Sequence, residues 1–139
     1  MSLSYEFDYS MRDSGEAFLA DVLDGLDMAI VVIDREGTVC AWNRALATLT
    51  GLPAVAVEGF RLRERFPDLD TAWFDELAGE ARQLGRARRY TPVTGQRVLA
   101  ALGVGDGATP TACSIVRVGR DTDHEDSLCL AFQFGPSAP

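Results

Sequence analysis

The positions of apolar and polar residues divide this chain into strand-like and helix-like stretches, most clearly from residue 28 onward. Residues 28–33 are apolar throughout and rich in β-branched side chains, which predicts a strand covered on both faces. The turn formers of 34–37 follow, and 38–42 is typical of a second strand. The pattern therefore predicts an antiparallel hairpin over 28–42.

Helices are predicted on both sides of this hairpin. After it, Asn43 suits an N-cap, Leu46 and Leu49 form an apolar stripe, and Gly51 is suited to end the helix. Before it, a helix over 14–27 carries an apolar stripe at helical spacing, made of Phe18, Leu19, Val22, Leu23 and Leu26.

Further helices are predicted in the middle of the chain. Pro53 can open a short turn of helix over 53–57, and a second short helix is expected within 60–67. Asp70 can cap a longer helix over 70–84, whose apolar residues share one side.

The last part of the chain has strand-like patterns. Strands are predicted at 112–118 and 127–134, joined as a hairpin. Earlier, 86–91 and 96–102 both read as strands, and the pattern does not decide which of the two is the true third strand. Strands split by a helical segment predict an α+β fold with an antiparallel sheet.

Composition restricts the partners. The chain has a net charge of -8, with 13 arginines and no lysine, which argues against nucleic acid and anionic membranes. No apolar run approaches the roughly 18 residues of a membrane span, so a cytoplasmic protein is expected. The three cysteines, Cys40, Cys113 and Cys129, are odd in number and widely spaced, which predicts free thiols.

Four short runs together resemble a PAS domain: 30–34 (IVVID) before Gly37, 42–46 (WNRAL), 49–52 (LTGL) and 58–59 (EG). The resemblance implies a five-stranded antiparallel sheet with short helices and one longer helix on one face. An N-terminal flanking helix is expected on the other face. The implied division is a flexible arm, a flanking and dimerisation helix, a PAS core and a tail, at 1–13, 14–27, 28–134 and 135–139.

The resemblance also allows two cofactors to be weighed. Flavin-binding light sensors of the family carry a reactive cysteine just after the position of Gly59, where this chain has Leu62. Haem-binding members use a histidine on the longer helix or nearby, and 70–84 contains none. A flavin–cysteine adduct and a His-ligated haem are therefore not expected, and the cofactor stays open.

Two charged segments have alternative interpretations. The loop 121–126 holds four acids and the only histidine, His124, and is interpreted as a solvated hairpin tip rather than a metal site. The segment 82–97 holds five arginines and no acid. It is interpreted as a solvated face, with binding of an anionic ligand or an acidic partner as the alternative.

Strand alternation predicts a ligand pocket and a dimer surface. If Ala29, Val31 and Ile33 point inward, a matching register gives a pocket lined by Ala29, Val31, Ile33, Leu62, Trp73, Leu77, Ala81, Ser114, Val116, Ala131 and Gln133. A filled core is the alternative, and a shift of one residue would exchange the faces. The opposite face is too apolar for water, which predicts a homodimer through Phe18, Val22, Leu26, Ile115, Leu130 and Phe132.

The function implied by the resemblance is a sensory module of bacterial signal transduction. It would bind a small ligand or partner and relay the change to an effector, with a sensor histidine kinase first and a diguanylate cyclase second. A ligand-free dimerisation module is the alternative. A small enzyme is disfavoured because the sequence shows no nucleophile–base pair and one histidine, so no catalytic residue is predicted.

Overall fold

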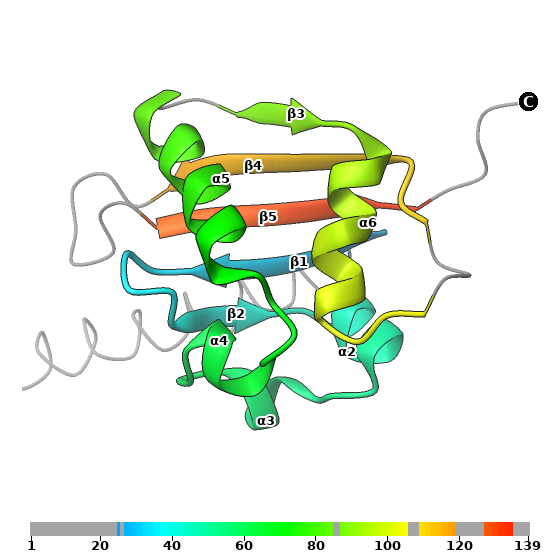
Figure 1. Cartoon of the computed structure of the whole chain (residues 1–139). Coiled ribbons are helices and arrows are strands. Elements are labelled where there is room, and N and C mark those ends of the chain that lie inside the picture. The colour runs from blue at the N-terminus through cyan, green and yellow to red at the C-terminus, as the bar shows by residue number, and fades with distance from the viewer. Residues whose placement is uncertain (1–24, 26, 85–86, 106–108, 119–126, 135–139) are drawn as a thin grey trace, which may run out of the picture.

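Five antiparallel strands form one sheet in the order β2-β1-β5-β4-β3. The computed structural model describes residues 25, 27–84, 87–105, 109–118 and 127–134. The strands are β1 (Met28–Ile33), β2 (Val39–Trp42), β3 (Arg88–Tyr90), β4 (Ala112–Val118) and β5 (Ser127–Gln133). The helices are α2 (Arg44–Thr50), α3 (Ala54–Val57), α4 (Leu62–Arg65), α5 (Thr71–Leu84) and α6 (Pro92–Ala101). Figure 1 shows α5 and α6 crossing the same face of the sheet, α5 toward one end of the strands and α6 toward the other.

The first strands and α2 form as their residues predict. The Asp34 carboxylate accepts hydrogen bonds from the backbone N–H groups of Glu36 and Thr38, and Gly37 takes a φ of 83°, so the turn between β1 and β2 is tight. Asn43 caps α2 by accepting the N–H of Leu46. The predicted hairpin, N-cap and helix are all confirmed.

The helices of the middle segment also follow their predicted signals. Asp70 accepts the backbone N–H of Trp73 at 3.1 Å and so caps the long helix α5. The ring of Trp42 on β2 stacks on Phe66 with centroids 5.7 Å apart, which fixes the end of α4 against the sheet. The Trp42 indole N–H donates to the carbonyl of Leu52 at 2.9 Å and holds the segment before α3.

One predicted strand is a helix. The range 96–102 lies largely in α6, whereas 86–91 contains β3, which settles the third strand of the sheet. Thr91 is the N-cap of α6 and Pro92 follows at its first position, and both are helix-start residues. Val98 and Leu99 are fully buried by this helix, so the apolar residues that suggested a strand belong to its packed side.

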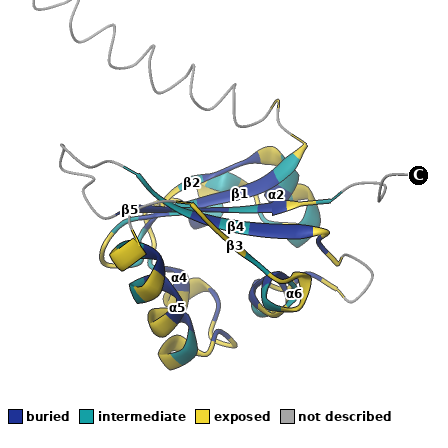
Figure 2. Ribbon diagram, turned by 90° about the horizontal axis from the view of Figure 1, so that it is seen from above, coloured by how far each residue is buried: buried dark blue, intermediate teal, exposed yellow. Residues whose placement is uncertain are grey.

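The two faces of the sheet differ in what covers them. We call the face under α4, α5 and α6 the inner face and the opposite one the outer face (Figure 2). Cys113 lies on the inner face, because a Cβ at Gly95 of α6 would be 2.9 Å from its Cβ. Cys113 pairs with Phe132, and Phe132 pairs with Ala29, so all three share that face.

This register corrects the predicted faces of β4 and β5. Ala29, Val31 and Ile33 are on the inner face as expected, but they pair with Phe132, Leu130 and Leu128. The predicted pocket residues of these two strands therefore lie on the outer face; they are Ser114, Val116, Ala131 and Gln133. Three predicted dimer residues lie on the inner face and are fully buried in the core; they are Ile115, Leu130 and Phe132. The cause is the one-residue ambiguity of a period-two pattern.

The core lies between the inner face and the helices. It contains Ala29, Val31 and Ile33 of β1 together with Leu62, Leu77, Ala81 and Val98. The dimer candidates Phe18, Val22 and Leu26 lie outside the described residues, as do the arm, most of 14–27, the loop 121–126 and the tail. None of the helices in the described ranges has both the length and the apolar character of a membrane span.

Candidate functional site

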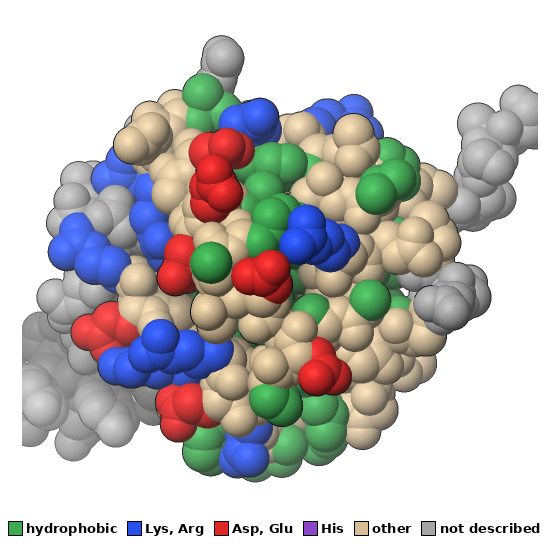
Figure 3. Space-filling model, in the orientation of Figure 1, with side chains coloured by type: hydrophobic (Ala, Val, Ile, Leu, Met, Phe, Trp, Pro, Cys, Tyr) green, Lys and Arg blue, Asp and Glu red, His purple; other side chains and the backbone are tan. Residues whose placement is uncertain are grey.

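A cavity of about 80 Å³ opens where the β1–β2 turn meets α4 and α5. Its apolar wall consists of Ile33, Leu62, Leu69, Phe74 and Ala78. Its polar rim consists of Arg35, Glu36, Gly37, Arg61, Arg63, Thr71, Asp75 and Arg82. Basic side chains gather on this part of the helical face, with acidic side chains among them (Figure 3). The cavity therefore combines an apolar interior with a charged mouth.

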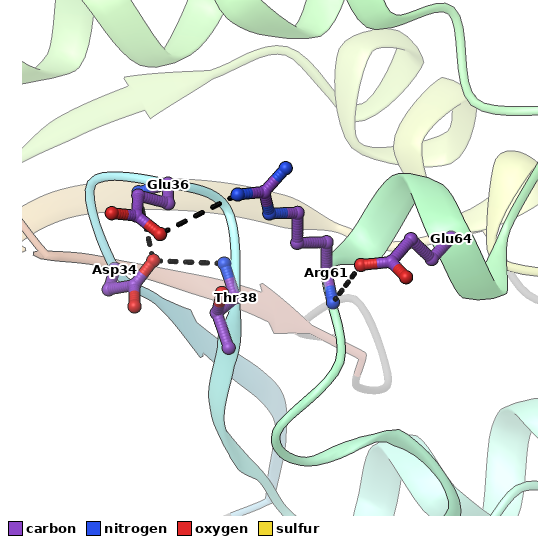
Figure 4. A network of polar contacts seen from close by, with 5 residues as sticks. All are labelled: Asp34, Glu36, Thr38, Arg61 and Glu64. Carbon is purple, nitrogen blue, oxygen red and sulfur yellow. Dashed lines mark hydrogen bonds and ion pairs between the residues drawn. The ribbon is translucent and has the colours of Figure 1, made fainter.

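The β1–β2 turn is tied to the segment before α4 by backbone hydrogen bonds. Val39 donates to Phe60 and accepts from Gly59, both at 2.9 Å, and Leu62 donates to Gly37 at 2.9 Å. Side chains add to this link: Glu36 lies 3.7 Å from the guanidinium of Arg61 (Figure 4). These bonds hold the β1–β2 turn and α4 in place on two sides of the cavity.

Arg82 connects the third side of the cavity to the sheet. Its Nη2 donates to the carbonyl oxygen of Asp34 at 3.2 Å, which joins α5 to the β1–β2 turn. Its own carbonyl accepts from Nη1 of Arg117 on β4 at 3.5 Å. A displacement of Arg82 would therefore disturb its contacts with both the β1–β2 turn and β4.

The structure gathers only part of the predicted pocket. Ile33 and Leu62 line the cavity, whereas the others from β1 and α5 are buried in the core; they are Ala29, Val31, Leu77 and Ala81. Trp73 lies in a separate surface groove of about 270 Å³ between α5 and α6, with the guanidinium of Arg97 3.9 Å above its ring. The pocket residues predicted on β4 and β5 face away from the cavity.

The rim residues were missed by strand alternation, because they lie outside the strands, on the β1–β2 turn and on or beside α4 and α5. One signal for them was present, because Arg82 begins the acid-free segment 82–97. Arg61 had no such signal, since its place at the cavity depends on how the segment before α4 folds back beside the turn.

The size of the cavity limits its ligand. Pockets for drug-sized ligands span about 300–1,000 Å³, so this cavity suits a group of a few non-hydrogen atoms. Within the described ranges, no cluster of three or more His, Cys, Asp or Glu side chains is placed to hold a metal ion.

The thiols are held in their neutral form. Burial raises the pKa of the Cys113 thiol to about 11 and also raises the pKa of Cys129. Burial, with the nearby carboxylates of Asp34 and Glu58, raises the pKa of Cys40. A protonated thiol is a poor nucleophile, so none of the three is activated for covalent catalysis.

A second feature lies where the chain enters and leaves the sheet. Met28, the first residue of β1, pairs with Gln133, the last residue of β5. Thr111 joins them, since both its backbone N–H and its hydroxyl donate to the carbonyl of Gln133. We call this corner the terminal edge; it lies at the opposite end of β1 from the cavity.

Comparisons with known proteins agree with this architecture. A family model described as "PAS domain" matches residues 17–85. A search of curated proteins finds no match. Among solved structures, the PAS domain of an HTR-like protein from Haloarcula marismortui is 17% identical, with a TM-score of 0.56, and the match covers 91% of this chain and 96% of that one.

Two further solved structures show a similar degree of likeness. The PAS domain of BvgS from Bordetella pertussis is 18% identical, with a TM-score of 0.57 and 89% coverage of both chains. A sensory box sensor histidine kinase from Vibrio cholerae is 10% identical, with a TM-score of 0.56, and the match covers 91% of this chain and 96% of that one. The similarity in fold and the family-model match together show that this chain belongs to the PAS domain family.

Proposed function

We propose that this PAS domain is the sensory module of a signalling protein, in which a change of packing passes through the terminal segments to an effector. A sensor histidine kinase is the first candidate effector, because the Vibrio cholerae structure with this fold comes from one. A diguanylate cyclase is the second candidate. The domain itself performs no catalysis, and we place it in the cytoplasm of a bacterial cell.

The observation that carries this proposal is the pairing of Met28 with Gln133. The chain enters and leaves the sheet through adjacent positions on its two neighbouring strands β1 and β5. A shift of one strand against the other therefore moves both connections together. A ligand can drive such a shift only by the difference in its affinity for the two arrangements.

The outer face is the second support, because it is apolar without being fully covered within the described residues. Val32, Val116, Cys129 and Ala131 are half-buried there. An apolar surface of this kind is typical of an interaction site. We propose that the 14–27 segment and a second copy of the chain cover it, which gives a homodimer.

A charge on the outer face tests the dimer. We expect Val116→Arg to be a monomer in sedimentation equilibrium, because a buried unpaired guanidinium is costly at an apolar interface. Val55→Arg is the matched control, since Val55 lies on α3 and is 84% exposed. It should remain a dimer, and circular dichroism should show both variants folded. A dimeric Val116→Arg variant would contradict this interface, and a monomeric parent chain would contradict the homodimer.

A ligand-free dimerisation module is the second candidate, and the filled core favours it. The inner face is packed by large side chains from α5 and α6 in place of a wide pocket. Native mass spectrometry separates the two candidates. A mass above that of the denatured chain would support a ligand-binding sensor, whereas a bare dimer would support the dimerisation module.

A further inference from the structure

The mouth of the cavity carries positive charge in an acidic protein. Four arginines line it, Arg35, Arg61, Arg63 and Arg82, against two acids, Glu36 and Asp75. The chain as a whole has a net charge of -8. An excess of cations at one small concavity therefore runs against the overall charge, and such a local field attracts anions.

Arg61 is held only weakly in its present contact. Its guanidinium lies 3.7 Å from Glu36, and the two side chains are 42% and 70% exposed. Exposed ion pairs of this kind contribute little to stability, so Arg61 can turn toward a ligand at small cost. Arg82 reaches the cavity from α5, where its Nη2 donates to the carbonyl oxygen of Asp34 at 3.2 Å.

The dimensions fit one charged group. A cavity needs about 10–15 Å³ of such volume to hold one water molecule, so about 80 Å³ holds a group of a few non-hydrogen atoms, such as a phosphate or carboxylate. The planar guanidinium matches the oxygen pairs of both groups with two parallel hydrogen bonds. The apolar wall of Phe74 and Ala78 lowers the local polarity, which strengthens such bonds.

We propose that this cavity binds a small oxyanion, a phosphate or carboxylate group, between Arg61 and Arg82. Binding of the anion does not depend on the proposed signalling function, since a domain that passes on no signal could still hold the anion. Arg82 also holds the carbonyl of Asp34, so the bound state is expected to change the environment of the β1–β2 turn.

The test is a titration followed by backbone amide NMR. Inorganic phosphate and succinate are added separately to the full chain at constant ionic strength, with chloride as the balancing ion. We expect shifts at Glu36, Gly37 and Leu62 that saturate below about 10 mM for at least one probe. Saturation by phosphate alone assigns the site to phosphate groups, and saturation by succinate alone assigns it to carboxylates.

Three variants of equal charge change decide whether the site is specific. Arg61→Gln and Arg82→Gln should each weaken binding about tenfold or more, which is about 1.4 kcal/mol. Arg89→Gln is the control, because Arg89 is exposed on β3 outside the cavity, and it should weaken binding less than about twofold. If Arg82→Gln does not fold, the exposed Arg61 alone decides. No saturation with either probe, or equal weakening in all variants, overturns the proposal while leaving the dimer tests unaffected.

Discussion

Gly95 on α6 lies so close to Cys113 on β4 that a Cβ atom at Gly95 would be 2.9 Å from the Cβ of Cys113. The same atom would be 3.0 Å from Cγ of Pro110. This backbone-level approach lets α6 seal the inner face beside α5, with Val98 and Leu99 in the core. The residue is a glycine because no larger side chain fits between the helix and the strand.

Replacing Gly95 should therefore destabilise the fold. In Gly95→Ala, crowding against β4 costs about 1–3 kcal/mol, and the better helix propensity of alanine returns about 1 kcal/mol, so a net loss of up to about 2 kcal/mol is expected in urea unfolding. Gly79→Ala on α5 is the control, because nothing lies within 4 Å of its added Cβ. That variant should gain about 0.5–1 kcal/mol. A stabilised Gly95→Ala variant would show that α6 is not packed this tightly.

Asn43 should contribute more than an ordinary helix cap. Its carboxamide oxygen accepts from the N–H groups of Ile30 and Leu46, and its nitrogen donates to the carbonyl of Met28 at 2.7 Å. Asn43→Ala leaves these buried groups without this partner, so we expect a loss of about 3 kcal/mol in thermal or urea unfolding.

The comparison for this prediction is Thr91→Ala. Thr91 is also an N-cap, but it is exposed, and its hydroxyl bonds to the backbone N–H and the hydroxyl of Thr94. Its removal should cost about 1 kcal/mol or less. Equal losses in the two variants would show that the bonds from Asn43 to β1 add nothing.

Cys113 should make stability depend on alkaline pH. Its thiol has a pKa of about 11 in the folded chain, against an ordinary value of 9.0. Below pH 9 the thiol is protonated in both states and has no effect. Between pH 9 and 11 the unfolded chain releases a proton that the folded chain keeps, so the free energy of unfolding falls by up to about 1.4 kcal/mol per pH unit.

Urea unfolding at several pH values between 8.5 and 10.5 checks this prediction. Cys113→Ala removes the titrating group, so its stability should fall less steeply over that window than that of the parent chain. The comparison of slopes is independent of any constant loss from the smaller side chain. Identical slopes would show that the Cys113 thiol titrates alike in both states.

Local signals in the sequence predicted much of the fold. The β1–β2 hairpin, the Asn43 and Asp70 caps and the long helix each depend on neighbours within a few residues, which a sequence shows directly. The range 96–102 was misassigned because a short apolar run suits either element. The start signal of Thr91 and Pro92, five residues earlier, favoured the helix that the structure contains.

The candidate site was harder to predict, because it depends on contacts between distant segments. Alternation places Ile115 and Ser114 on opposite faces of the sheet. Only the pairing of Cys113 with Phe132 shows which of the two faces the helices. The cavity likewise requires Arg61 and Arg82, which lie in different parts of the chain, to line the same space beside the β1–β2 turn. Neither relationship is a property of a local pattern.

The backbone bonds between Val39 and the Gly59–Phe60 segment also affect how copies of this chain can associate. They occupy the outer edge of β2, so another strand cannot add there. At the other edge, β3 has only three residues, and Arg88 and Arg89 are both exposed. Short, charged or covered edges protect a sheet against extension into aggregates. Association of copies through the edges of the sheet is therefore disfavoured, and the sheet is protected from growing strand by strand into fibres.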